Sequence, residues 1–295
     1  MITWEIRYFA FAGIIMGLFA GFVSCGAQYY KVSLEDDTPE LASANVGSDD
    51  PKAPNFGLHA PGGWVELPIS FMTSSELTPA QLKGLKLAMS TWEKAVGKQL
   101  FDFKGVEKDV TGDSFGDLYS SLNDNLNGHY LDGNWGKTGK SRVVLATTIW
   151  ENDPDDPKKI LTADIRYNHE FYTLGDSFDL KPKDGREVVD MQTLALHELG
   201  HLLGLSHINS SADGQSIMNP SLYIGEGLAN RRLSKGDIQR AQKIYGCDGS
   251  ACDIDKTLAE LNQLEMNQRR KPGSNQAPKS EKESVTASSS ETQRY

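Results

Sequence analysis

Hydrophobic residues recur at helical spacing shortly after residue 78. Thr78-Pro79-Ala80-Gln81 combines an N-cap threonine, a proline at the first helical position and a capping-box glutamine, which is typical of a helix start. The apolar side chains that follow on one helical face are Leu82, Leu85, Met89, Trp92 and Val96. The pattern predicts an amphipathic helix whose apolar face lies in the core.

A second helical segment, from residue 188 to 203, is apolar on nearly every side, which predicts a buried helix. Further on, Ser234 with Asp237 three residues later predicts the start of another helix, which Gly246 would end. Asp253 to Arg270 could form one more amphipathic helix.

Four shorter stretches have the character of strands. Their ranges are Val65–Phe71, Leu100–Phe103, Arg142–Trp150 and Ile160–Tyr167. In the last of them apolar and polar residues alternate, as in a half-buried strand. The first two flank the first predicted helix, and this strand–helix–strand order indicates a right-handed crossover with parallel pairing. Mixed helices and strands of this kind predict the α+β class.

The segment with the most chemical information is His197-Glu198-Leu199-Gly200-His201-Leu202-Leu203-Gly204-Leu205-Ser206-His207. Residues four apart share a helix face, so His197 and His201 can direct two imidazoles at one point. Glu198 is rotated about a quarter turn away, so it lies beside the metal without being a ligand. Two imidazoles and a carboxylate in an apolar helix need a compensating group, and a bound cation provides it.

Gly204 can take a left-handed conformation, end the helix and turn the chain. That turn allows His207 to return as a third ligand. Three protein ligands leave a fourth coordination position for water, which is the arrangement of catalytic rather than structural zinc.

These residues resemble the metzincin zinc endopeptidases. Ser216-Ile217-Met218-Asn219-Pro220 looks like the metzincin Met-turn, which places Met218 beneath the metal. The residue two positions after that methionine is Pro220, and in this the chain resembles the matrixins. Astacin-type and serralysin-type enzymes carry a tyrosine at that position as an extra metal ligand. The segments 161–167 and 233–246 also resemble the matrixin strand before the metal helix and the matrixin C-terminal helix.

The resemblance implies a metzincin-like zincin fold, with a twisted, mostly parallel sheet, an active-site helix, a Met-turn and a C-terminal helix. It implies one catalytic Zn²⁺ on His197, His201 and His207, and Glu198 as the general base of peptide hydrolysis. Asn219 to Tyr223 would line the pocket for the side chain beyond the scissile bond. The chain departs from matrixins at Ile208, where serine is usual. With Cys25, Cys247 and Cys252 as the cysteines of the sequence, a cysteine-switch propeptide is not expected.

The net charge bears on the partners of the protein, and a few polar residues bear on further metal sites. The formal net charge of −10 argues against nucleic acid, whose phosphates need clustered Lys and Arg. Residues 123–128 are faintly similar to a calcium loop but lack its last acidic ligand, so calcium stays an open, weakly supported alternative. His129 and His169 are structural-zinc candidates, with core or solvated histidines as the alternative. The expected partner is a protein or peptide substrate, and the oligomeric state is not indicated.

The N-terminus has the pattern of an export signal. Tyr8 to Val23 is almost continuously apolar, and Phe22-Val23-Ser24-Cys25-Gly26 resembles a bacterial lipoprotein processing site, with Cys25 as the lipidated residue. An ordinary signal peptide and an uncleaved anchor are the alternatives, and all three place the protein in the cell envelope or outside the cell. Export favours a Cys247–Cys252 disulfide over two free thiols.

The expected organisation has four parts. They are a signal segment (1–25), an acidic tether or short pro-region (26–55), a metallopeptidase domain (56–252), and a short helix with a disordered tail (253–295). The expected function is a zinc endopeptidase acting on extracellular or envelope proteins. A non-catalytic envelope binding protein that retains the fold, and a zinc hydrolase of a non-protein amide, remain as alternatives.

Overall fold

The computed structural model describes residues 30–33, 50–107 and 127–269. Predictions about Cys25, residues 123–126 and the tail after residue 270 lie outside these ranges. Within them, none of the helices is both long enough and apolar enough to cross a membrane.

A six-stranded sheet forms one layer of the molecule. Its strands are β2 (Gly63–Trp64), β3 (Ile69–Ser74), β4 (Phe101–Glu107), β5 (Gly128–Asp132), β6 (Ala146–Asn152) and β7 (Lys159–Asn168). The order is β2-β7-β5-β3-β4, and β6 pairs with β7. Every pairing is parallel except that of β6 with β7. The mostly parallel sheet with helices confirms the α+β class.

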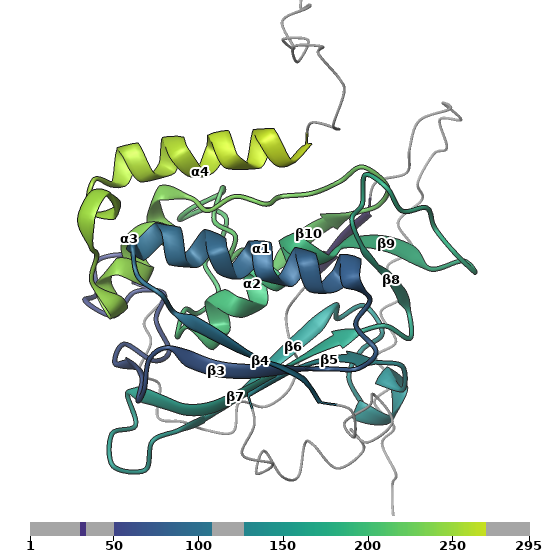
Figure 1. Cartoon of the computed structure of the whole chain (residues 1–295), viewed down its shortest axis with the longest axis horizontal. Coiled ribbons are helices and arrows are strands. Elements are labelled where there is room, and N and C mark those ends of the chain that lie inside the picture. The colour runs from purple at the N-terminus through teal and green to yellow at the C-terminus, as the bar shows by residue number, and fades with distance from the viewer. Residues whose placement is uncertain (1–29, 34–49, 108–126, 270–295) are drawn as a thin grey trace, which may run out of the picture.

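The helices lie on one side of this sheet (Figure 1). Their bounds are α1 (Pro79–Val96), α2 (Met191–Leu202), α3 (Lys235–Tyr245) and α4 (Ile254–Arg269). Two short 3-10 turns, η2 (Trp135–Thr138) and η3 (Gly249–Cys252), complete the helical elements of the described chain. A disulfide joins Cys247 to Cys252 just after α3.

The start of α1 follows from its sequence. The Thr78 hydroxyl accepts from Gln81 N, and Gln81 Oε1 accepts from Thr78 N, so the predicted capping box is present. Leu85, Met89, Trp92 and Val96 are buried, whereas Leu82 is only partly so. The Trp92 indole donates to the Leu196 carbonyl at 2.9 Å, which fixes α1 against α2.

Two of the predicted strands begin later in the structure than expected. The stretch Val65–Phe71 becomes a strand only at Ile69, where β3 begins, because Pro68 just before it has no N–H to donate to a ladder. The stretch from Arg142 begins as a strand only at Ala146, since a turn that joins Val144 N to Ser141 O precedes it.

Two further sheets have two strands each. In one, β8 (Tyr172–Gly175) pairs in parallel with β9 (Glu187–Asp190), which runs directly into α2. In the other, β1 (Tyr30–Ser33) pairs antiparallel with β10 (Ser221–Ile224). Four residues of the expected tether or short pro-region 26–55 therefore pair with a strand of the domain that follows.

Candidate metal centre

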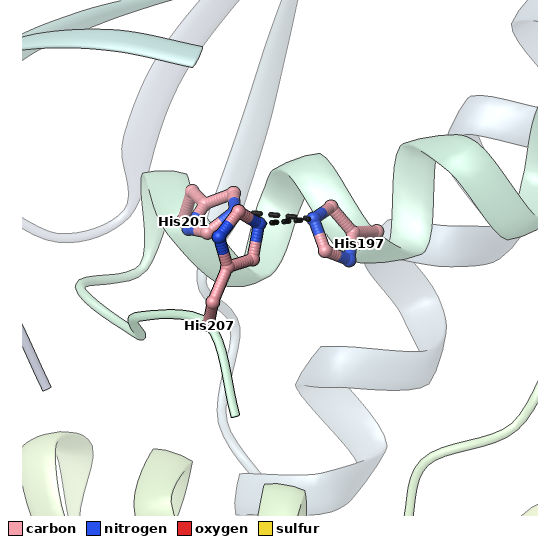
Figure 2. Close-up of side chains that lie close together, drawn as sticks. All are labelled: His197, His201 and His207. Atoms are coloured by element: carbon pink, nitrogen blue, oxygen red, sulfur yellow. Dashed lines mark hydrogen bonds between the residues drawn. The ribbon is translucent and has the colours of Figure 1, made fainter. Parts of the chain in front are cut away.

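Three imidazoles meet at one point near the C-terminal end of α2. His197 and His201 come from the helix, and His207 returns from the loop that follows it (Figure 2). The Nε2 atoms of His197 and His201 are 3.1 Å apart, those of His201 and His207 are 3.1 Å apart, and those of His207 and His197 are 3.3 Å apart.

In His197 and His201, the hydrogen bond at Nδ1 fixes which ring nitrogen carries the proton. His197 Nδ1 lies 2.6 Å from the Ile217 carbonyl, and His201 Nδ1 lies 2.8 Å from the Leu205 carbonyl. A carbonyl oxygen only accepts, so both Nδ1 atoms donate and both Nε2 atoms carry lone pairs. Lone pairs that face each other across 3.1 Å repel unless a cation lies between them.

The spacing fits zinc. A tetrahedral zinc ion with nitrogen ligands at about 2.0–2.1 Å needs those nitrogens to be about 3.3–3.4 Å apart. Burial, followed by the neighbouring His207, lowers the pKa of His197 to about 3. Burial and the other histidines also lower the pKa of His201. Both rings are thus neutral at pH 7, as metal binding requires. Among the described residues, only these three histidines form a group that could hold a metal ion.

The turn that returns His207 depends on Gly204. Its φ is +99°, and a β-carbon there would lie 2.6 Å from the Ala60 carbonyl oxygen. The turn is braced by an N-terminal segment, since Ser206 N donates to Gly57 O and His59 N donates to Gly204 O, both at 2.9 Å. Residues 57–60 therefore fix the position of the third ligand.

The methionine turn lies beneath the histidines and is held from α3. Met218 is fully buried, and its carbonyl accepts from Ile208 N at 2.8 Å. The Asp237 carboxylate accepts from Ile217 N at 2.8 Å and from the Ser216 hydroxyl at 2.5 Å. Because Ile217 O is the partner of the His197 ring, Asp237 orients a ligand through the backbone of a single residue, Ile217. In the sequence Asp237 was recognisable only as a helix cap.

Glu198 has a partner that sequence reasoning missed. Its carboxylate is buried at 2% exposure and accepts a hydrogen bond from Thr148 Oγ1 on β6 at 2.6 Å. Its negative charge adds to burial in raising the pKa of Tyr167.

His59 and Trp150 form a second unpredicted feature beside the centre. Their rings stack with centroids 4.0 Å apart, and His59 Nε2 donates to the His201 carbonyl at 2.8 Å. Burial lowers the pKa of His59 to about 4, so this ring is neutral at pH 7. No local motif marked either residue, since one precedes the domain's first strand and the other looks like an ordinary strand aromatic.

The other candidate ligands do not gather around an ion. His129 is 1% exposed, and its Nδ1 lies 3.2 Å from the Tyr167 hydroxyl, so it is a core histidine. His169 belongs to no metal group in the described part of the chain. Near them, Arg166 and Asp132 form a buried ion pair inside the sheet.

Fold and site together define the metzincin class: an α+β domain in which one helix and the loop after it supply three histidines, with a methionine turn below them. The matrixin family profile matches residues 85–246, which is more than half of the chain. The chain belongs to the matrixin family, whose members use a catalytic zinc.

Curated relatives match over a shorter stretch. Matrilysin of Felis catus is 44% identical over 64 residues, which is 21% of this chain and 23% of the relative. Metalloendoproteinase 5-MMP of Arabidopsis thaliana is 42% identical over 59 residues, or 20% and 15% of the two chains. Stromelysin-2 of Rattus norvegicus is 43% identical over 58 residues, or 20% and 12%. The matched part spans less than a quarter of each of these relatives.

Proposed function

We propose that the protein is a zinc-dependent endopeptidase that hydrolyses peptide bonds with Glu198 as general base. The observation that carries this proposal is the meeting of three histidine Nε2 atoms within 3.1–3.3 Å of one another beside a buried carboxylate. A zinc ion bound there supplies a Lewis acid and lowers the pKa of water toward neutrality.

The chain's own residues provide the rest of the chemistry. The Glu198 carboxylate takes one proton from the attacking water and returns it to the departing amine nitrogen, while the carbonyl C–N bond breaks and a C–O bond forms. His197 and His201 keep their Nδ1 protons on the Ile217 and Leu205 carbonyls throughout. These hydrogen bonds prevent the rings from turning away from the centre.

The substrate is proposed to lie along β6. Within the described residues this strand pairs only with β7, so its other edge has backbone groups to offer to an extended peptide. Thr148 places this strand against Glu198, so a peptide on that edge passes the centre. Residues 219–223 follow the methionine turn and are proposed to line the pocket beyond the scissile bond.

Substitutions at the centre test the activity. Glu198→Gln should retain zinc but lose about 10²–10⁴-fold in turnover of casein or a peptide library. His201→Ala should lose both zinc and turnover. Glu66→Gln is the matched control, because Glu66 is exposed and plays no part in the centre. Unchanged hydrolysis by Glu198→Gln, or hydrolysis that survives complete removal of metal, would falsify the assignment.

The proposed location is the cell envelope, with Cys25 as the lipid attachment point. The apolar stretch before Cys25 and the Cys247–Cys252 disulfide both support export to an oxidising compartment. Mass spectrometry of the mature N-terminus distinguishes the outcomes. A diacylglyceryl mass on Cys25 supports the proposal, whereas a mature chain that begins after Cys25, or an intact Met1, contradicts it.

A further inference from the structure

The contact between Thr148 and Glu198 joins a strand to the helix that carries the metal centre. Thr148 Oγ1 lies 2.6 Å from Glu198 Oε2 and 3.2 Å from the Glu198 carbonyl oxygen. A hydroxyl has one proton to donate. The shorter contact is to the charged group, where a hydrogen bond is stronger, so the hydroxyl donates its hydrogen bond to the carboxylate.

The position of the hydroxyl is set by the backbone of β6. Thr148 pairs with Ile165 in the middle of the β6–β7 ladder, so its Cα cannot shift without breaking that ladder. Side chains alternate along a strand, and Thr148 therefore shares a face with Trp150, whose ring packs on His59 beside His201. A β-branched side chain has few χ1 rotamers, which keeps Oγ1 pointing at the helix.

Glu198, in contrast, has a long side chain that needs a second point of attachment. Its backbone is fixed in α2, but three side-chain torsions separate the backbone from the carboxylate. A hydrogen bond at Oε2 restricts the carboxylate to rotations that keep that oxygen on Thr148. Small displacements of a reacting group cost large factors in rate, about 10²-fold for 1 Å.

We infer that Thr148 is a positioning residue for hydrolysis, because its hydroxyl holds Oε2 of Glu198 and so directs the carboxylate toward the reacting water. The hydroxyl keeps its own proton, and only Glu198 exchanges one with water and the leaving amine. The inference rests on the proposed function and adds a residue from a strand 50 positions before the helix glutamate.

Kinetics of three variants test the inference. Thr148→Val keeps the shape and removes the hydroxyl, and Thr148→Ser keeps the hydroxyl. With a quenched-fluorescence peptide that the wild type cleaves, Thr148→Val should lower kcat about 10–100-fold with KM within about 2-fold and zinc content unchanged. Thr148→Ser should recover most of the loss. Thr73→Val is the control, since it removes a threonine hydroxyl from another strand of the same sheet.

A double substitution shows whether the effect passes through Glu198. In a Glu198→Gln background, Thr148→Val should have little further effect on residual turnover. Equal loss in both backgrounds, or full kcat in Thr148→Val while the wild type is active, overturns the inference. A wild type that binds zinc but cleaves no peptide contradicts the proposed function instead.

Crystal structures of the wild type and Thr148→Val give a readout that does not need activity. The Glu198 carboxylate should occupy one position in the wild type, with Oε2 on Thr148, and more than one rotamer in the variant. An identical, single Glu198 conformer in both proteins contradicts the positioning role, whatever the turnover.

Discussion

Gly200 and Met218 are in such close contact that no larger residue fits at position 200. A β-carbon on Gly200 would lie 2.3 Å from Met218 Sδ and 3.1 Å from its Cε. Met218 is fully buried, so it has little room to move away. The glycine between the two helical histidines thus sets the distance between α2 and the methionine turn.

Gly200→Ala should destabilise the protein although alanine favours helices. The helix propensity gain is about 1 kcal/mol, whereas overpacking typically costs about 1–3 kcal/mol and here would also displace the turn that holds His197. Urea unfolding should show a net loss, together with weaker zinc binding. Gly133→Ala is the control, since its β-carbon would meet no atom within 4 Å. A Gly200→Ala protein more stable than the wild type would contradict this packing argument.

Arg231 should stabilise the N-terminus of α2, because it neutralises the buried carboxylate that caps the helix. Asp190 caps the helix by accepting from Thr193 N, and the same Oδ1 accepts from Arg231 Nε, both at 2.9 Å. Both side chains are buried, so Arg231→Met leaves an unpaired buried carboxylate and should cost about 3–5 kcal/mol in unfolding free energy.

The double variant Asp190→Asn with Arg231→Met should be more stable than Arg231→Met alone, because asparagine still caps the helix without a charge. Lys235→Met breaks an exposed pair with Asp255 and should cost under about 1 kcal/mol. Denaturant unfolding of the wild type, Arg231→Met, the double variant and Lys235→Met measures these differences. A double variant less stable than Arg231→Met would show that the buried charge is not the cause.

His129 should make the fold sensitive to mild acid. Burial lowers its pKa to about 3 in the native state. An unfolded histidine has a pKa of about 6.5, so below that pH the unfolded state binds a proton that the native state does not. Stability is therefore complete above about pH 6.5 and decreases as the pH falls toward 3, by up to about 1.4 kcal/mol per pH unit.

His129→Gln removes this titration and keeps a polar partner for Tyr167. Between pH 6.5 and 5, the unfolding free energy of the variant should depend less steeply on pH than that of the wild type. The difference in slope should correspond to about one proton fewer taken up on unfolding. The other buried histidines contribute equally to both proteins when the zinc content is the same. An unchanged slope would mean that His129 is already protonated or exposed.

Metal removal should lower thermal stability through the three histidines. A ligand that binds only the native state stabilises it by about 4 kcal/mol at a thousand times its Kd. Chelation should therefore lower Tm, and added zinc should restore it. His201→Ala should show neither change. A wild-type Tm that does not respond to chelator would contradict a bound metal ion.

Sequence reasoning could predict what local spacing determines. Thr78 and Gln81 mark the start of α1 by their own hydrogen bonds, and Gly204 marks the bend because few other residues adopt its φ. The contact of Thr148 with Glu198 depends instead on how β6 packs against α2, which no pattern near either residue encodes. The late start of the first predicted strand, at Ile69, follows from Pro68, a residue that has no N–H to donate.

The pairing of β1 with β10 has a geometric consequence for an anchored protein. Tyr30 lies opposite Ile224, at the far end of the strand that follows the methionine turn. If Cys25 carries a lipid, five residues of at most about 3.6 Å each keep Tyr30 within about 18 Å of the bilayer surface. The domain would then be held close to that surface, and inserting residues before Tyr30 would extend its reach.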